Sequence, residues 1–181
     1  MPPEVVARAA TGDPGAFADM VRYYDRRLRA LAWRLLGDQA AMDDVLQEVY
    51  VKAYRALPRF HHGSSPGTWL HRITYNACID EVRRRARRPH QPYDEQLAVE
   101  AHAGAGPEAV VADRAALAQA LGRLPADQRA AVILVDAEGF DYRSAAEVLG
   151  VAAGTVASRL SRARAALRAV LDGRAEEDGR R

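Results

Sequence analysis

Two runs of helical periodicity, separated by one glycine, occupy residues 139–171 and limit what this part of the chain can form. Asp141 stands where an N-cap residue would start the first run, and Gly150 can adopt the left-handed conformation that ends a helix. The second run starts near residues 152–155 and repeats apolar side chains at steps of three and four, at Val156, Leu160, Ala163, Leu167 and Leu171. Two helices joined by so tight a turn predict a helix-turn-helix, whose second helix lies in the major groove of DNA.

Polar side chains gather on another face of the second predicted helix: Thr155, Ser158, Arg159 and Arg162. Arginine can bind a phosphate or pair with both acceptors of a guanine, and serine and threonine hydroxyls can contact several bases. This composition favours a surface that reads duplex DNA. An ordinary helical hairpin with a solvated basic face is the alternative that the spacing alone leaves open.

Helical spacing also covers most of the remaining chain, so we expect an all-α protein. The predicted helices are 4–10, 16–36, 39–57, 66–88, 115–124 and 125–138. Gly37 ends the second of these, Asp38 can cap the third, and Ser65 followed by Pro66 can start the fourth. Residues 131–135, AVILV, could also form a strand, but they lie among helix formers and we interpret them as helix.

Charge divides the chain into three parts. Residues 1–88 carry a net charge of +5, residues 89–113 carry −5 and residues 114–181 carry +2. The acidic stretch contains Pro and Gly and has no helical period, which is typical of a flexible linker. We therefore expect two small helical domains joined by a flexible linker: a first domain 1–88, the linker 89–112, a second domain 113–175 with the helix-turn-helix, and a disordered tail 176–181. Two basic domains suggest a polyanionic partner, although such charges are also common on a solvated surface.

Several classes of function lack their sequence signature here. No G-x-x-x-x-G-K-[ST] phosphate loop occurs, and the five His residues do not stand at metal-ligand spacing with Cys78. Cys78 is the single cysteine and cannot form an intramolecular disulfide; we expect it to be a buried apolar residue. No apolar run can span a membrane and no secretion signal is recognisable, so we expect a cytoplasmic protein without membrane insertion. We predict no catalytic residue, cofactor or metal, and a nucleic-acid enzyme is the least favoured alternative.

The predicted helix 66–88 combines aromatic, amide and cationic side chains. One of its faces, at steps of three and four, consists of Trp69, Arg72, Asn76, Asp80 and Arg83, and an arginine run ends the helix. Proteins that hold unpaired bases use stacking surfaces beside positive charge, which favours a single-strand-binding surface. The alternative is that Trp69 and Tyr75 belong to the core and that the arginine run is a solvated helix end, where positive charge suits the helix dipole.

Three blocks, taken in order, resemble one known family. They are AMDDVLQEVYVKAYRAL, GTWLHRITYNACIDEVRRR and LPADQRAAVILVDAEGFDYRSAAEVLGVAAGTVASRLSRARAALR, and together they cover most of residues 16–171. On these blocks the chain resembles bacterial RNA polymerase sigma factors of the extracytoplasmic-function type, within the sigma-70 family. The resemblance implies a sigma factor that binds core RNA polymerase, recognises the −10 and −35 promoter elements and initiates transcription. A helix-turn-helix regulator that binds duplex DNA without joining the polymerase is the alternative.

The resemblance also implies which residues act. The surface that would bind core polymerase, through the β′ clamp helices and the β subunit, comprises Asp43, Asp44, Gln47, Glu48 and Lys52. The −10 element, with a base flipped out of the stack, would be held by the loop 59–67 and the helix behind it, through His62, Ser64, Trp69, Arg72, Asn76, Asp80, Arg83 and Arg84. The −35 element would be read by Thr155, Ser158, Arg159, Arg162 and Arg164.

Three further expectations come with the resemblance. Relatives often carry Arg or Lys where this chain has Ala157, so we expect one −35 contact to be missing. The acidic linker, with Asp94, Glu95 and Glu100, would mimic nucleic acid in the polymerase channel. An anti-sigma factor that covers the polymerase-binding and promoter-binding surfaces is also implied.

Overall fold

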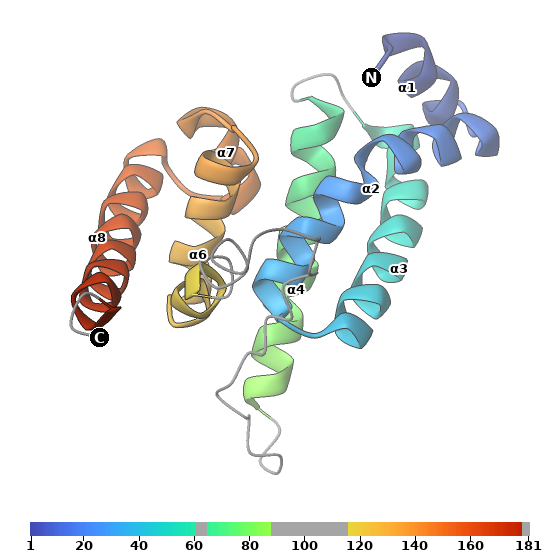
Figure 1. Cartoon of the computed structure of the whole chain (residues 1–181). Coiled ribbons are helices and arrows are strands. Elements are labelled where there is room, and N and C mark those ends of the chain that lie inside the picture. The colour runs from blue at the N-terminus through green and yellow to red at the C-terminus, as the bar shows by residue number, and fades with distance from the viewer. Residues whose placement is uncertain (61–64, 88–115, 179–181) are drawn as a thin grey trace.

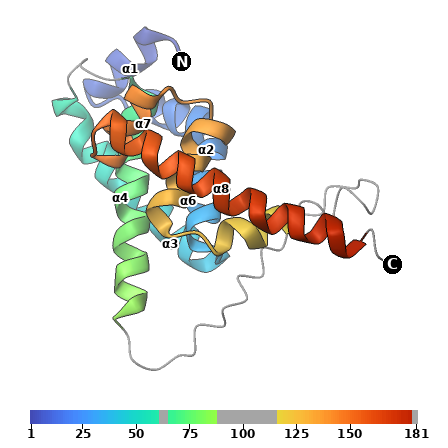
Figure 2. The same cartoon turned by 90° about the vertical axis from the view of Figure 1, so that its left-hand side faces the viewer.

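The computed structural model describes residues 1–60, 65–87 and 116–178, and the side-chain surroundings as far as residue 170. These residues are helical and contain no strand, which confirms the predicted all-α class, and they form two lobes that lie side by side (Figure 1, Figure 2). The first lobe consists of α1 (Pro3–Ala10), α2 (Pro14–Leu36), α3 (Gln39–Ala56), the short 3-10 helix η1 (Leu57–Arg59) and α4 (Pro66–Ala86). The second lobe consists of a helical segment over 116–122, α6 (Ala126–Val132), the π-helical turn η2 (Ile133–Ala137), α7 (Tyr142–Leu149) and α8 (Ala153–Asp178).

Short polar side chains begin three helices where the sequence predicts them. The carboxylate of Asp38 accepts a hydrogen bond from the amide of Ala41 at 2.9 Å, at the start of α3. Asp141 does the same for the amide of Ser144 at 2.7 Å, at the start of α7, and Ser65 caps α4. Each cap satisfies an amide that has no partner inside its own helix, so the helix boundaries follow from local chemistry.

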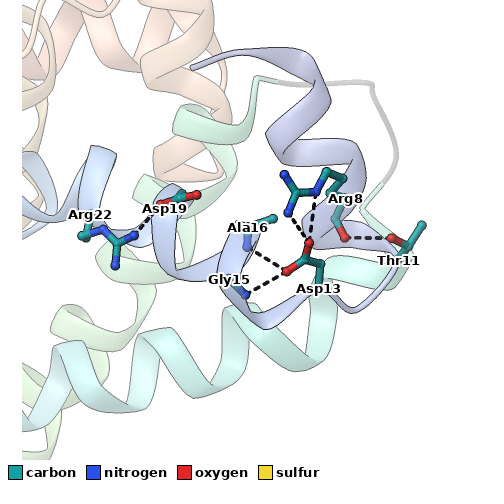
Figure 3. Close-up of polar contacts among 7 residues, drawn as sticks. All are labelled: Arg8, Thr11, Asp13, Gly15, Ala16, Asp19 and Arg22. Carbon is teal, nitrogen blue, oxygen red and sulfur yellow. Dashed lines mark hydrogen bonds and ion pairs between the residues drawn. The ribbon is translucent and has the colours of Figure 1, made fainter.

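The turn between α1 and α2 is held by one carboxylate that the sequence analysis did not single out (Figure 3). Asp13 accepts hydrogen bonds from the amides of Gly15 (2.9 Å) and Ala16 (3.0 Å), and so caps α2. Its other oxygen accepts two hydrogen bonds from the guanidinium of Arg8 on α1, and these bonds tie α1 to the start of α2. The backbone hydrogen bonds from Ala16 and the contact with Arg8 lower the pKa of Asp13, so this junction holds its charge at neutral pH.

Each lobe has an apolar core built from the predicted stripes. In the first lobe the fully buried side chains include Met20, Leu28, Leu31, Leu46, Val49 and Leu70, and in the second they include Ile133, Leu134, Val156 and Leu160. Cys78 is fully buried in the first lobe, as predicted. Burial raises the pKa of its thiol to about 12, so this residue acts as a small apolar core residue rather than a reactive thiol.

The two lobes are in contact, which the sequence did not predict. α4 packs along α7, and the end of α2 lies against α6 and η2 (Figure 1). The guanidinium of Arg129 on α6 is buried at this junction. It donates hydrogen bonds to the carbonyl oxygens of Arg34 (3.4 Å) and Leu35 (3.2 Å) in the last turn of α2. It also donates to the carbonyl oxygens of Gly122 (2.7 Å) and Leu124 (3.0 Å), and so satisfies the ends of two helices from different lobes.

The second lobe departs from the prediction at η2 and at the end of α8. Residues 133–137 form a π-helical turn, in which the amide of Glu138 donates to the carbonyl of Ile133, five residues earlier, at 2.9 Å. Residues 176–178 of the expected disordered tail are helical, because α8 continues to Asp178 through Arg, Ala and Glu residues that favour helix. The predicted linker 89–112 and residues 179–181 lie outside the described residues.

Candidate functional site

The first candidate surface is the predicted helix-turn-helix, which the structure forms from α7 and α8. Gly150 ends α7 with φ of 65°, a left-handed conformation that favours glycine, and the chain then turns into α8. Ala145 on α7 and Val156 on α8 are fully buried, so the apolar sides of both helices face the core of the lobe. The opposite side of α8 is therefore available for contacts outside the lobe.

Two predicted duplex-reading residues of α8 are exposed. The Ser158 hydroxyl donates a hydrogen bond to the carbonyl of Thr155 at 2.9 Å, and Thr155 itself is half-buried. The Nε of Arg162 donates to the carbonyl of Ser158 at 3.2 Å, which holds the side chain along the helix surface. Both Ser158 and Arg162 can exchange these weak local hydrogen bonds for contacts with a DNA base or phosphate. Ala157 directly precedes Ser158 in the chain and presents no polar group.

The other two predicted −35 residues are held by carboxylates of their own lobe. Arg159 is 18% exposed and its Nε lies 3.1 Å from Asp127 of α6. Arg164 makes two hydrogen bonds to Asp136 of η2, at 3.1 and 2.5 Å, and this contact raises the pKa of the guanidinium. Their role in DNA binding stays a prediction, and each residue would have to leave its carboxylate to fulfil it. Helical periodicity could not indicate these pairs, because each joins two different helical elements.

The second candidate surface lies on α4. Arg72, Asn76, Asp80 and Arg83 are exposed, whereas Trp69 is 7% exposed and packs against the ring of Phe60 at a centroid distance of 5.1 Å. Tyr75 is also buried. In this conformation both aromatic residues therefore belong to the core of the lobe, which was the alternative to a single-strand-binding surface. His62 and Ser64, which the resemblance also assigned to this surface, lie outside the described residues.

The arginine run at the end of α4 divides into two kinds of residue. Arg84 and Arg85 donate hydrogen bonds to Glu81 at 2.6 and 2.7 Å, and Arg85 also reaches Asp38 at the start of α3. Burial raises the pKa of Glu81, but the two arginines outweigh it and leave that pKa below its ordinary value. Arg83 lies 3.8 Å from Asp80, a long contact, and both side chains are exposed. Arg83 is therefore better placed for a phosphate than Arg84 or Arg85.

The third candidate surface is the acidic face of α3. All five predicted residues are exposed: Asp43, Asp44, Gln47, Glu48 and Lys52. Asp43 accepts a hydrogen bond of 2.6 Å from Arg29 of α2, and Lys52 lies 2.6 Å from Glu48 one helical turn away. Pairs between exposed side chains contribute little to stability, so these carboxylates can turn toward a basic partner at small cost.

Two apolar side chains on the same helix were missed by the sequence analysis. Val51 is 47% exposed and Tyr54 is 43% exposed, although large apolar residues usually lie inside. Both fall outside the buried stripe of α3, so their positions relative to that stripe could have identified them. Protein-binding surfaces commonly combine such an apolar patch with charged residues around it.

The described part of the chain offers little to other kinds of site. Within residues 1–60, 65–87 and 116–178, no three His, Cys, Asp or Glu side chains lie together in a way that could hold a metal ion. Among the helices in those ranges, none is both long and apolar enough to cross a lipid bilayer.

Comparisons with known proteins agree with this arrangement. The sequence matches the family described as Sigma-70 region 2 over residues 20–88, and the family described as Sigma-70, region 4 over residues 114–167. Over 168 residues it is 39% identical to the ECF RNA polymerase sigma factor SigM of Mycobacterium tuberculosis, which covers 93% of this chain and 83% of that protein.

Two solved structures are similar over both lobes. One is CnrH in complex with the cytosolic domain of CnrY, with a TM-score of 0.71, 29% identity, and coverage of 93% of this chain and 96% of that chain. The other is the sigma factor RpoE of Bartonella quintana in complex with the anti-sigma factor NepR, with a TM-score of 0.70, 32% identity, and coverage of 86% and 96%.

Proposed function

Because the chain belongs to the extracytoplasmic-function sigma factors of the sigma-70 family, we propose that it binds core RNA polymerase, recognises the −10 and −35 promoter elements and initiates transcription. The observation that carries this function is the order of the two family matches, one on each lobe of a single chain. Sigma factors are non-enzymatic initiation factors, so the polymerase supplies the chemistry. We place the polymerase-binding and −10-binding domain at 1–88, a linker at 89–112 and the −35-binding domain at 113–175.

Core polymerase would dock on the acidic face of α3. Asp44 and Glu48 are exposed one helical turn apart, with the apolar side chains of Val51 and Tyr54 on the same helix. Carboxylates can attract a basic surface of the polymerase, and the apolar pair can then be buried in the contact.

The −10 element would be held along the exposed face of α4. Asn76 has an amide that can pair with the edge of an unpaired base, and Arg72 and Arg83 can contact phosphates on either side of it. Trp69 would support this surface from within the core rather than stack on a base, unless the first lobe rearranges on DNA.

Replacement of Arg162 tests the −35 surface. We expect Arg162→Ala to weaken binding of the holoenzyme to a −35 duplex by about 1–3 kcal/mol, if the guanidinium pairs with both acceptors of a guanine. The loss should be largest for the cognate −35 sequence and small for an unrelated duplex, measured by fluorescence anisotropy at several salt concentrations. Arg168→Ala is the matched control, because Arg168 is an exposed arginine of α8 beyond the predicted contact residues. Equal affinity of both variants for the cognate duplex would remove Arg162 from the reading surface.

An anti-sigma factor would regulate this protein. Both similar solved structures are complexes: RpoE of Bartonella quintana with the anti-sigma factor NepR, and CnrH with the cytosolic domain of CnrY. Both likenesses extend over most of this chain, so we expect a partner of the same kind here.

Run-off transcription with purified core polymerase tests the function as a whole. A sigma factor gives specific initiation at a promoter whose start has been mapped after overexpression of the chain. A helix-turn-helix regulator that does not join the polymerase would bind duplex DNA but give no specific transcript and no co-elution with core enzyme. That result would overturn the proposed function.

A further inference from the structure

A chain of hydrogen bonds joins α2 to α3 beside the acidic face of α3. The two helices lie side by side (Figure 1). Nη1 of Arg29 on α2 donates a hydrogen bond to Oδ1 of Asp43 on α3 at 2.6 Å. Nε of the same guanidinium donates to both carboxylate oxygens of Asp25, one helical turn earlier on α2, at 3.2 and 3.1 Å. Arg29 therefore bridges two carboxylates, one from each helix.

A tyrosine of α3 completes this chain of hydrogen bonds. The hydroxyl of Tyr50 donates to Oδ1 of Asp25 at 2.6 Å. Burial raises the pKa of Tyr50, and the hydrogen bond to Asp25 adds to the rise, so the hydroxyl keeps its proton at neutral pH and remains a donor. Tyr50 and Asp43 are seven residues apart, about two helical turns, and so lie on the same side of α3. Asp25 is thus held from α3, and it holds Arg29 in turn.

The bridge sets the direction of the Asp43 carboxylate and leaves it accessible. The side chain of Asp43 is 47% exposed, so a partner can still reach it. A guanidinium presents its donors in a rigid plane, and the contact of Nε with Asp25 therefore limits where Nη1 can point. A carboxylate that is already held in one direction loses less conformational entropy when a partner binds it.

Arg29 affects the attraction of a basic partner in two opposite ways. Asp25 and Asp43 carry two negative charges and Arg29 carries one positive charge, so the bridge keeps one net negative charge. The charge of Arg29 weakens the attraction of this cluster for a basic surface. Its hold on Asp43 instead favours binding, because less freedom is lost when the partner docks.

We propose that Arg29 is a positioning residue for core polymerase binding, which holds the Asp43 carboxylate in the direction in which it meets the partner. Asp25 and Tyr50 support it by fixing the guanidinium. The hold on Asp43 outweighs the charge of Arg29, so the intact bridge makes docking tighter. The inference rests on the proposed docking of core polymerase on α3, and it extends that surface to residues of α2.

Replacement of Arg29 by methionine separates positioning from charge, because the two effects predict opposite results. Arg29→Met makes the surface more acidic, so binding would become tighter if Arg29 only neutralised Asp43. We expect instead that the affinity for core polymerase falls by about threefold to tenfold, the range for ordering one side chain at an interface. Titration of the fluorescently labelled full-length chain with purified core enzyme measures the change.

Arg26→Met is the matched control. Arg26 is an exposed arginine of the same helix and lies outside the bridge. The charge change is the same as in Arg29→Met, so this variant should bind core enzyme as tightly as the unchanged chain or slightly more tightly.

Two further variants test whether the effect passes through Asp43. Tyr50→Phe removes one hydroxyl without a change in charge, and it should weaken binding by less than Arg29→Met does. Arg29→Met added to Asp43→Ala should weaken binding no further than Asp43→Ala alone, because the carboxylate to be held is then absent. Circular dichroism and urea unfolding check that each variant is folded. If Arg29→Met unfolds, Arg29→Lys takes its place, since lysine keeps the charge but cannot span both carboxylates.

The outcomes separate this inference from the proposed function. Binding by Arg29→Met as tight as that of Arg26→Met, or tighter, would overturn the inference. An equal loss from Arg29→Met in chains with and without the Asp43 carboxylate would overturn it as well, because Arg29 would then act by another route. An unchanged chain that shows no binding to core polymerase would contradict the proposed function itself.

Discussion

The double variant Asp44→Arg, Glu48→Arg is expected to lose its association with core RNA polymerase. Both carboxylates are exposed on α3. The two substitutions change the net charge of this surface by four units, so that it would repel a basic surface of the partner. Like charges brought together at an interface cost several kcal/mol, so we expect a loss of about 3 kcal/mol or more, which is over about 100-fold in affinity. Co-elution with core enzyme in size-exclusion chromatography measures the effect, and specific run-off transcription should disappear with it.

A matched control distinguishes docking from a general effect of charge. Glu4→Arg with Asp19→Arg makes the same change in net charge in the same lobe, at exposed positions on α1 and α2. This control should bind core enzyme as the unchanged chain does, and both variants should keep the helical circular dichroism spectrum. If the α3 variant co-eluted with core enzyme as well as the control does, the polymerase would have to dock elsewhere.

The variant Arg129→Met is expected to lower the free energy of unfolding by about 3 kcal/mol. Methionine has a similar length but donates no hydrogen bond, so the carbonyls of Leu35 and Leu124, in buried hydrogen bonds, and of Gly122, in a partly buried one, would lose their donor. A buried acceptor left without a partner costs about 1–3 kcal/mol, and several are affected at once. Urea unfolding followed by circular dichroism measures the loss.

Arg123→Met is the control for that experiment. Arg123 is an exposed arginine just after the 116–122 helical segment, and surface substitutions usually change stability by less than about 0.5 kcal/mol. Equal stability of the two variants would mean that the carbonyls around Arg129 find other donors or reach water when the guanidinium is removed.

The sequence by itself determined the helices of this protein. Asp38, Ser65 and Asp141 cap α3, α4 and α7 as predicted, and Gly150 ends α7 with a left-handed conformation. A cap involves residues two or three positions apart, and an apolar stripe follows the period of a single helix, so both can be recognised without knowledge of the fold. The acidic residues of α3 lie outside its apolar stripe, so their exposure could also be predicted from the period of that helix.

The tertiary structure decided which charged side chains remain available for partners. Arg164 and Arg162 look equivalent in the sequence, but Arg164 is held by Asp136, 28 positions away, whereas Arg162 forms its hydrogen bonds, among the described residues, within its own helix. Arg85 is likewise held by Asp38 across 47 positions. Such pairs depend on how separate helices are placed in space, and helical periodicity carries no information about that placement.

The contact between the lobes is the clearest product of tertiary structure. Glu138 meets Arg34 across 104 positions, and Arg129 reaches the carbonyl of Leu35 across 94. In the sequence these residues are ordinary members of two amphipathic patterns, one on each side of an acidic stretch. Their meeting depends on the orientation of one lobe against the other, which is set by the packing of α4 on α7 and of α2 on α6 rather than by any local preference of the chain.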